Sequence, residues 1–89
     1  MLQLVYTRQF EKDVKRCKRR GKDFEKFKII ARTLLKGQAL DAIHRAHKLS
    51  GNFQGRRECH IESDWLLIYK IEKERLVFER LGSRSDLFK

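Results

Sequence analysis

The chain has 89 residues, no proline and a formal net charge of +10. This length accommodates one domain over residues 1–89 and excludes a second, and no apolar run approaches the roughly 18 residues of a membrane span. The opening residues, MLQLVYTRQF, alternate like a strand and lack the basic start and apolar stretch of a secretory signal, so we expect a cytoplasmic protein that does not bind membranes.

The first third of the chain is predicted to form a strand followed by two amphipathic helices. Alternating apolar side chains over residues 2–6 indicate the strand. Thr7 is expected to cap a first helix that stops at Gly21, and Asp23 a second that stops at Gly37. Apolar stripes at helical spacing mark the two helices: Phe10, Val14 and Cys17, then Phe24, Phe27, Ala31 and Leu34.

The second half is predicted to form a sheet. A loop with a helical turn leads to a short strand near residues 47–49, and three clearer strands follow over 56–61, 65–71 and 76–81. The segment WLLIYKI is apolar on both faces, so we expect it to be a central strand covered on each side. The fold class is therefore α+β, with two N-terminal helices packed on a small, mainly antiparallel sheet.

The positive charge is concentrated in the helical part of the chain. Residues 1–36 contain 12 Lys and Arg against 4 Asp and Glu, whereas residues 37–89 contain 10 against 8. A charge run such as KRCKRRGK is ordinarily a solvated helix face. Here acidic residues barely interrupt it, and a basic stripe on a small domain is typical of nucleic-acid binding.

Alternation along the strands predicts a polar working surface opposite the helices. One face of the strand over 56–61 carries polar groups and the other is partly apolar. The two sets are Arg56, Glu58 and His60 on the open face, and Arg57, Cys59 and Ile61 toward the helices. In the last strand, Leu76, Phe78 and Arg80 are expected to share a face, with Arg80 at the strand's end.

We considered a metal site because His44, His47, Cys59 and His60 are possible ligands. Cys59 and His60 are adjacent on a predicted strand and point apart, and no short paired spacing is present. We therefore expect no metal, and two reduced, mostly buried cysteines. The same geometry argues against a Cys59 nucleophile with His60 as its base.

The remaining histidines, arginines and a carboxylate suit metal-free RNA cleavage. That reaction needs a base for the ribose 2'-hydroxyl, a cation for the phosphorane and an acid for the leaving oxygen. Histidine serves as acid or base near neutral pH, and arginine binds phosphate through paired hydrogen bonds. Composition alone favours the alternative, a passive nucleic-acid binder.

Two segments, HKLSGNFQGRRECHIESDWLLIYKI and FERLGSRSDLF, carry a family resemblance. Their ordered motifs are H-x-L-x-G, R-x-x-H, x-D-W, E-R-x-G and a terminal L-F. The chain resembles the YafQ branch of the RelE-type toxins, ribosome-dependent mRNA endoribonucleases of bacterial toxin-antitoxin pairs. The resemblance implies a RelE-like microbial ribonuclease fold, entry into the ribosomal A site and cleavage of the codon there by 2'-hydroxyl attack, without a cofactor.

The resemblance also assigns roles to residues of this chain. His47 and His60 match histidines tied to proton transfer and phosphate contact, and Asp64 matches an acidic position of the same site. Arg80 matches the arginine that steadies the transition-state phosphate, and Phe88 an aromatic bordering the pocket. The residues that we assign to RNA contact are Lys15, Arg16, Arg19, Arg20, Lys48, Arg56, Arg57 and Trp65; Trp65 is also expected to fill part of the core.

The chain departs from the family pattern at one position. The family commonly has histidine where GSRSDLF has Arg84, and arginine holds its proton too tightly to act as an ordinary general acid. Three interpretations stay open: His47 or His60 donates the proton, Arg84 contributes only positive charge, or the chain is an attenuated form. A non-catalytic RNA-binding or ribosome-binding homologue that acts with an antitoxin in operon repression is the alternative function.

The expected partners follow from the resemblance. They are mRNA in the ribosomal A site, ribosomal RNA and a cognate antitoxin protein, with operator DNA bound only through the antitoxin complex. The basic N-terminal half suits ribosomal RNA, because such contacts do not depend on sequence and weaken steeply with salt. It also suits an acidic antitoxin.

Overall fold

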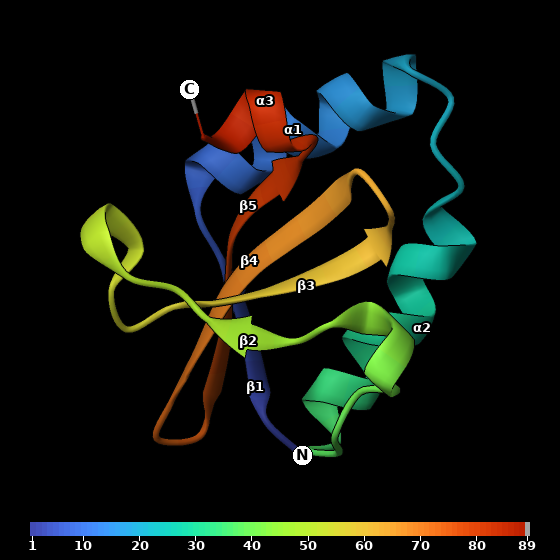
Figure 1. Ribbon diagram of the computed structural model, residues 1–89. Helices are drawn as coiled ribbons and strands as arrows, with labels where there is room; N and C mark the ends of the chain where they lie inside the picture. The colour runs from blue at the N-terminus through green and yellow to red at the C-terminus, as the bar shows by residue number, and fades with distance from the viewer. Residues whose placement is uncertain (89) are drawn as a thin grey trace.

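The computed structural model describes residues 1–88 and contains a single mixed sheet with helices on both of its faces (Figure 1). In chain order the elements are β1 (Gln3–Tyr6), α1 (Arg8–Arg19), α2 (Phe24–Leu35), the 3-10 turn η1 (Ala42–His44), β2 (His47–Lys48), the 3-10 turn η2 (Gly51–Phe53), β3 (Arg57–Glu62), β4 (Trp65–Glu72), β5 (Arg75–Gly82) and α3 (Arg84–Leu87). In the described part, no helix has the length and apolar character needed to cross a membrane.

The sheet has the strand order β1-β5-β4-β3-β2, so β4 lies at its centre. β1 runs parallel to β5, and the other neighbours are antiparallel. The α+β class and the mainly antiparallel sheet are thus confirmed. The three strands predicted for the second half are also confirmed, with ends that differ from the expected ones by one residue at most.

The two predicted helices form with the predicted caps. The Thr7 hydroxyl accepts a hydrogen bond from the backbone N–H of Phe10 at 3.0 Å, and the Asp23 carboxylate accepts one from the N–H of Glu25 at 3.0 Å. After α1, Gly21 adopts a φ of +76°, a left-handed conformation that glycine enters without steric cost. Both helices lie on one side of the sheet, because their apolar stripes share one core with it.

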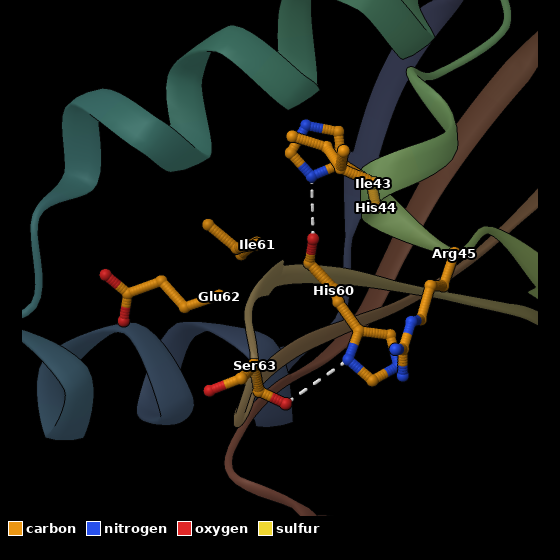
Figure 2. A pocket seen from close by; sticks show the side chains of 7 residues that line it. All are labelled: Ile43, His44, Arg45, His60, Ile61, Glu62 and Ser63. Atoms are coloured by element: carbon orange, nitrogen blue, oxygen red, sulfur yellow. Dashed lines mark hydrogen bonds between the residues drawn. The ribbon is translucent and has the colours of Figure 1, made fainter.

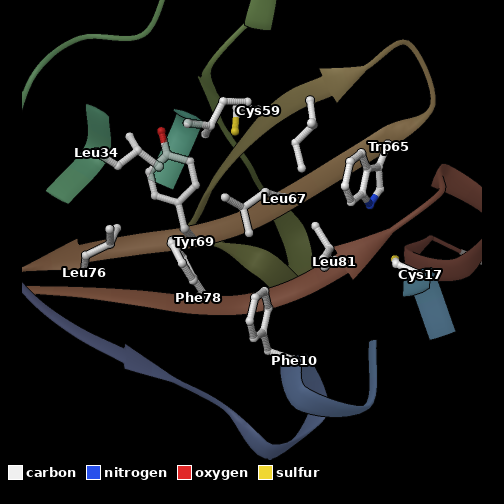
Figure 3. Packing of buried hydrophobic residues seen from close by; sticks show 12 residues of the cluster. Phe10, Cys17, Leu34, Cys59, Trp65, Leu67, Tyr69, Leu76, Phe78 and Leu81 are labelled. Carbon is white, nitrogen blue, oxygen red and sulfur yellow. The ribbon is translucent and has the colours of Figure 1, made fainter. Parts of the chain in front are cut away.

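The main core lies between these helices and the sheet (Figure 3). It contains the predicted apolar stripes and the helix-facing residues of the strands. Both cysteines are free and buried in it, as expected. Burial raises the pKa of the Cys59 thiol to about 12, so this group stays protonated and is a poor nucleophile at neutral pH.

A second, smaller core covers the opposite face of β4. Leu66 and Ile68 of β4 and Leu87 of α3 form its buried centre. The partly buried residues packed against them are Leu49, Phe53 and Phe88. The expectation that β4 is covered on both faces is therefore confirmed, and the cover on this side consists of α3 and the η2 loop.

The expected alternation in β5 is wrong at its end. The pairing shifts between Tyr69–Phe78 and Ile68–Arg80, so that β5 has one extra residue at this point. Phe78 and Leu81 both belong to the helix-facing core. Arg80 therefore does not continue the row of Leu76 and Phe78, because the irregularity changes which side chains face the helices.

The helix α3 was not predicted, and polar contacts define it. Ser83 and Asp86 form a reciprocal capping box: the Ser83 hydroxyl accepts from the N–H of Asp86, and the Asp86 carboxylate accepts from the N–H of Ser83. Arg20, the residue that caps the C-terminal end of α1, donates to both Asp86 carboxylate oxygens, at 2.6 and 3.2 Å. The end of α1 thus fixes the start of α3.

We expect Asp86→Asn to lower the free energy of unfolding at pH 7 by about 1 kcal/mol, because it weakens the capping box and a solvent-screened ion pair. The Arg20 guanidinium holds the pKa of Asp86 well below its usual range. The stabilisation is therefore complete above a pH of about 4 and is lost as the pH falls below it. Denaturant unfolding of the parent chain and of Asp86→Asn between pH 7 and pH 2 measures how this difference in stability depends on pH. A difference that stays constant down to pH 2 contradicts the prediction.

Candidate active site

A cluster of polar side chains lies on the sheet face opposite the two long helices. β2 supplies His47 and β3 supplies Glu58 and His60, while Arg84 comes from the first turn of α3. His47 and Glu58 are direct cross-strand partners, and His60 follows Glu58 two residues later on the same face. The prediction that Glu58 and His60 lie opposite Cys59 and Ile61 is confirmed, since the latter two are core residues.

The carboxylate of Glu58 is the centre of this cluster, although its side chain is only 1% exposed. One of its oxygens, Oε1, accepts a hydrogen bond from Nη2 of Arg84 at 3.1 Å. The same oxygen lies 3.4 Å from Nε2 of His47 and 3.6 Å from Nε2 of His60. The other oxygen, Oε2, is buried and has no hydrogen-bond partner among residues 1–88. One buried anion thus faces a guanidinium and two imidazoles.

Backbone carbonyls determine which nitrogen of each imidazole is available. Nδ1 of His47 lies 2.7 Å from the carbonyl oxygen of Arg45, and Nδ1 of His60 lies 3.3 Å from that of Ser63. Because a carbonyl oxygen only accepts, each Nδ1 carries the hydrogen. Nε2 is then the position at which each ring gains or loses a proton, and in both rings it faces Glu58.

His60 is held at two points beside a pocket of about 330 Å³ (Figure 2). Nδ1 of His44 donates to the carbonyl oxygen of His60 at 2.7 Å, so η1 fixes the backbone of β3 at this residue. The imidazole ring of His60 is hydrogen-bonded to the carbonyl oxygen of Ser63 in the β3–β4 turn. The side chain of His60 is 13% exposed, against 49% for His47. His47 is therefore the more accessible of the two imidazoles.

Asp64 and Phe88 hold Arg84 over the cluster. The Asp64 carboxylate accepts a hydrogen bond from the backbone N–H of Arg84 at 2.8 Å, which joins the β3–β4 turn to the first residue of α3. The guanidinium carbon of Arg84 lies 5.3 Å from the centre of the Phe88 ring, within cation–π distance. Phe88 in turn packs edge-on against Phe53, with ring centres 5.5 Å apart. The structure thus brings together His47, His60, Asp64, Arg84 and Phe88.

Arg80 lies further along the same cross-strand row. Glu58 pairs with Ile68, which pairs with Arg80, so the Cα atoms of Glu58 and Arg80 are about 10 Å apart. The guanidinium of Arg80 binds the carboxylate of Asp13 on α1, with Nε at 2.8 Å and Nη2 at 3.4 Å. Arg80 therefore contacts α1 rather than the Glu58 cluster.

The basic residues assigned to RNA contact fall into two groups. Lys15, Arg19 and Lys48 are exposed. The others make internal contacts: Arg16 bonds Asp13, Arg20 bonds Asp86, Arg56 pairs with Glu79 at 3.6 Å, and Arg57 lines a pocket with Tyr69 on the helix side of the sheet. Much of the charge at the end of α1 therefore orders α3 and β5.

The assignment of Trp65 to RNA contact is corrected by its burial. Its side chain is 0% exposed and packs edge-on against Phe24, with ring centres 5.4 Å apart. Lys22 lies 5.6 Å from the centre of the indole ring. Trp65 begins β4 on the helix-facing side, so no base can stack on it, and it fills the core.

Glu58 and Asp13 are the residues that the sequence-based assignment missed. Both are buried carboxylates, with side chains 1% and 0% exposed. The sequence did contain an indication for Glu58, because a charged residue in the middle of a strand needs a polar partner. Asp13 gave no indication beyond its place beside the apolar stripe of α1, because its partners on β5, Arg80 and Leu81, are 67 and 68 residues away in the chain.

The polar cluster is poorly suited to hold a metal ion. Within residues 1–88 there is no group of three or more histidine, cysteine, aspartate or glutamate side chains placed to hold an ion. Arg84 donates to the Glu58 oxygen that faces both imidazoles, and a cation at that oxygen opposes metal binding. That the chain works without a metal remains a prediction.

Comparisons with known proteins agree with the geometry. The family described as "Bacterial toxin of type II toxin-antitoxin system, YafQ" matches residues 2–89. The mRNA interferase toxin YafQ of Escherichia coli (strain K12) is 40% identical over 86 residues, which cover 96% of this chain and 94% of that protein.

Solved structures give the same result. The toxin in the E. coli DinJ-YafQ complex has a TM-score of 0.93 and 38% identity over 100% of both chains. A metal-bound toxin from Helicobacter pylori has a TM-score of 0.92 and 34% identity over 99% of this chain and 100% of that one. The predicted resemblance is thus confirmed, and this chain belongs to the YafQ family of bacterial type II toxin-antitoxin toxins.

Proposed function

We propose that this chain is a ribosome-dependent mRNA endoribonuclease that cleaves the codon in the A site without a metal ion. The observation that carries the proposal is the convergence of Nε2 of His47, Nε2 of His60 and Nη2 of Arg84 on one sheet face. The E. coli relative's name, mRNA interferase toxin, supports the substrate class. We place this activity in the cytoplasm, where translating ribosomes are.

In the proposed reaction, the two imidazoles transfer protons and Arg84 stabilises charge. One imidazole takes the proton from the ribose 2'-hydroxyl through its Nε2, and the 2'-oxygen attacks the adjacent phosphorus. The bond from phosphorus to the 5'-oxygen breaks, and the second imidazole donates its Nε2 proton to that oxygen. The products are a 2',3'-cyclic phosphate and a 5'-hydroxyl. Arg84 supplies positive charge to the phosphate but no proton, because guanidinium does not deprotonate in proteins.

The remaining residues support this reaction. Phe88 offers a ring beside Arg84 against which a base or ribose can pack, and Asp64 fixes the start of α3. Arg80 adds a second guanidinium for the transition-state phosphate, one strand beyond Ile68. No step requires a cofactor.

A cognate antitoxin is the proposed protein partner. The E. coli relative is seen in complex with DinJ, and a net charge of +10 on this chain favours an acidic binding segment. Operator DNA is reached only through that complex. Lys15 and Arg19 are exposed on α1 and are the better candidates for contact with ribosomal RNA.

A second candidate function is a ribosome-binding toxin homologue that does not cleave RNA. Arg84 favours it, because the residue occupies the family's histidine position and its guanidinium is bound to Glu58 at 3.1 Å. Induced expression separates the two functions. Growth arrest with codon-phased cuts indicates the enzyme, arrest without cuts indicates a ribosome blocker, and neither indicates a partner that acts only in operon repression.

We expect His60→Ala and Arg80→Ala each to reduce mRNA cleavage by about a hundredfold or more, because each removes a proton-transfer or charge-stabilising group. Primer extension on a translated reporter measures the cuts. Arg32→Ala, which removes an exposed arginine from α2, is the matched control and keeps the parent activity. Undiminished cleavage by both site variants excludes the proposed reaction.

We expect Arg84→His to raise the cleavage rate on translating ribosomes at least about tenfold, because imidazole donates a proton near neutral pH and guanidinium does not. Arg84→Lys preserves the positive charge without a proton donor suited to neutral pH, and should stay close to the parent rate. Equal rates for Arg84→His and the parent chain remove the argument for attenuation.

We expect the double variant Lys15→Glu, Arg19→Glu to bind ribosomes more weakly and with a smaller dependence on salt. Each lost phosphate contact lowers the slope of log affinity against log salt concentration by about one. Binding to purified ribosomes at several KCl concentrations gives the slope. An unchanged slope shows that this face of α1 does not contact ribosomal RNA.

A further inference from the structure

Within the part of the chain that the structure describes, the last part of β5 has no strand beside it on its outer side. β1 ends at Tyr6, which pairs with Phe78, whereas β5 continues to Gly82. The backbone N–H of Leu81 instead donates to Oδ2 of Asp13 at 2.9 Å. A side chain of α1 therefore replaces the missing strand at this edge.

The same carboxylate orients the guanidinium of Arg80. Oδ2 of Asp13 accepts from Nε of Arg80 at 2.8 Å, and Oδ1 lies 3.4 Å from Nη2. Two contacts to one planar carboxylate fix the plane of a guanidinium, which one contact would not do. Arginine has five N–H donors, so most of them stay free for a phosphate.

The burial of Asp13 makes this arrangement rigid. Its side chain is 0% exposed, while that of Arg80 is 23% exposed and can reach a ligand. Arg16 Nη2 at 2.9 Å and Gln9 Nε2 at 3.3 Å complete the partners of Oδ1. A carboxylate surrounded in this way cannot turn toward solvent without leaving buried donors unpaired.

We propose that Asp13 is a positioning residue for cleavage: from α1, it holds the Arg80 guanidinium in the orientation that meets the transition-state phosphate. The inference rests on the proposed function and adds a residue that lies outside the Glu58 cluster. Asp13 also has a structural role, since it binds Leu81 and Arg16 whether or not RNA is bound. The experiment must separate the positioning role from the structural role.

A double-mutant cycle separates them. Single-turnover cleavage of a defined A-site codon on purified ribosomes is measured for the parent chain, Asp13→Asn, Arg80→Ala and the double variant. We expect Asp13→Asn to slow cleavage at least about tenfold with ribosome affinity unchanged, since misplacing a group by about 1 Å has effects of this size or larger. In the Arg80→Ala background, Asp13→Asn should have no further effect on the rate.

Two further variants serve as controls for a general loss of structure. Gln9→Ala removes another donor to the same carboxylate and leaves the Arg80 contact intact, so it should cleave at the parent rate. Arg80→Lys preserves the charge but cannot make the two-point contact, and should be nearly as slow as Arg80→Ala even if Asp13→Asn does not fold.

The outcomes are distinguishable. No cleavage by the parent chain overturns the proposed function and this inference with it. If the parent cleaves and Arg80→Ala is slow, then a parent-like rate for Asp13→Asn or for Arg80→Lys overturns the inference alone. So does a full Asp13→Asn effect in the absence of Arg80, because the carboxylate would then act through the fold.

Discussion

Burial of β4 on both faces is the constraint on which the rest of the structure depends. Its five residues from Trp65 to Tyr69 are all buried, so apolar side chains must be covered above and below the sheet. The two long helices cover one face. The other face is covered by α3 and the η2 loop, through contacts of Leu87, Phe53 and Phe88 with Leu66 and Ile68. Because Arg84 and Phe88 belong to that cover, packing the second core also places them beside the histidines of β2 and β3.

A buried carboxylate links this packing to chemistry. Removing the charge of Glu58 from water is costly unless cations and hydrogen bonds compensate it. Arg84 supplies the hydrogen bond, and an imidazolium formed at His47 or His60 would face the same oxygen. The cluster therefore favours positive charge near Glu58, and a phosphate is the ligand that such a surface suits.

Local patterns were sufficient for most of the fold but for only part of the site. The caps at Thr7 and Asp23, the stripes of α1 and α2 and the two-sided character of β4 depend on neighbours in the sequence, and these predictions are confirmed. The parallel pairing of β1 with β5, the extra residue near Arg80 and the short helix α3 depend on distant contacts, so periodicity did not indicate them. For the same reason the alternation expected at Arg80 was wrong and the assignment of Trp65 to RNA contact needed correction, while Glu58 and Asp13 were missed.

The arginine at position 84 changes which residues supply positive charge and which transfer protons in the proposed reaction. Its backbone position is fixed by Asp64 and its side chain lies between the Phe88 ring and Glu58, a place that suits a long, planar cation. A histidine there is shorter, and it would add a third imidazole to the cluster. With arginine, the C-terminal helix supplies only charge, and both proton transfers fall to the two imidazoles of the sheet. Those rings have Nδ1 occupied by backbone carbonyls, so each offers one nitrogen to the substrate, and the two nitrogens face a common carboxylate. The base and the acid of the proposed reaction would then share one buried carboxylate, with their ring centres 6.5 Å apart.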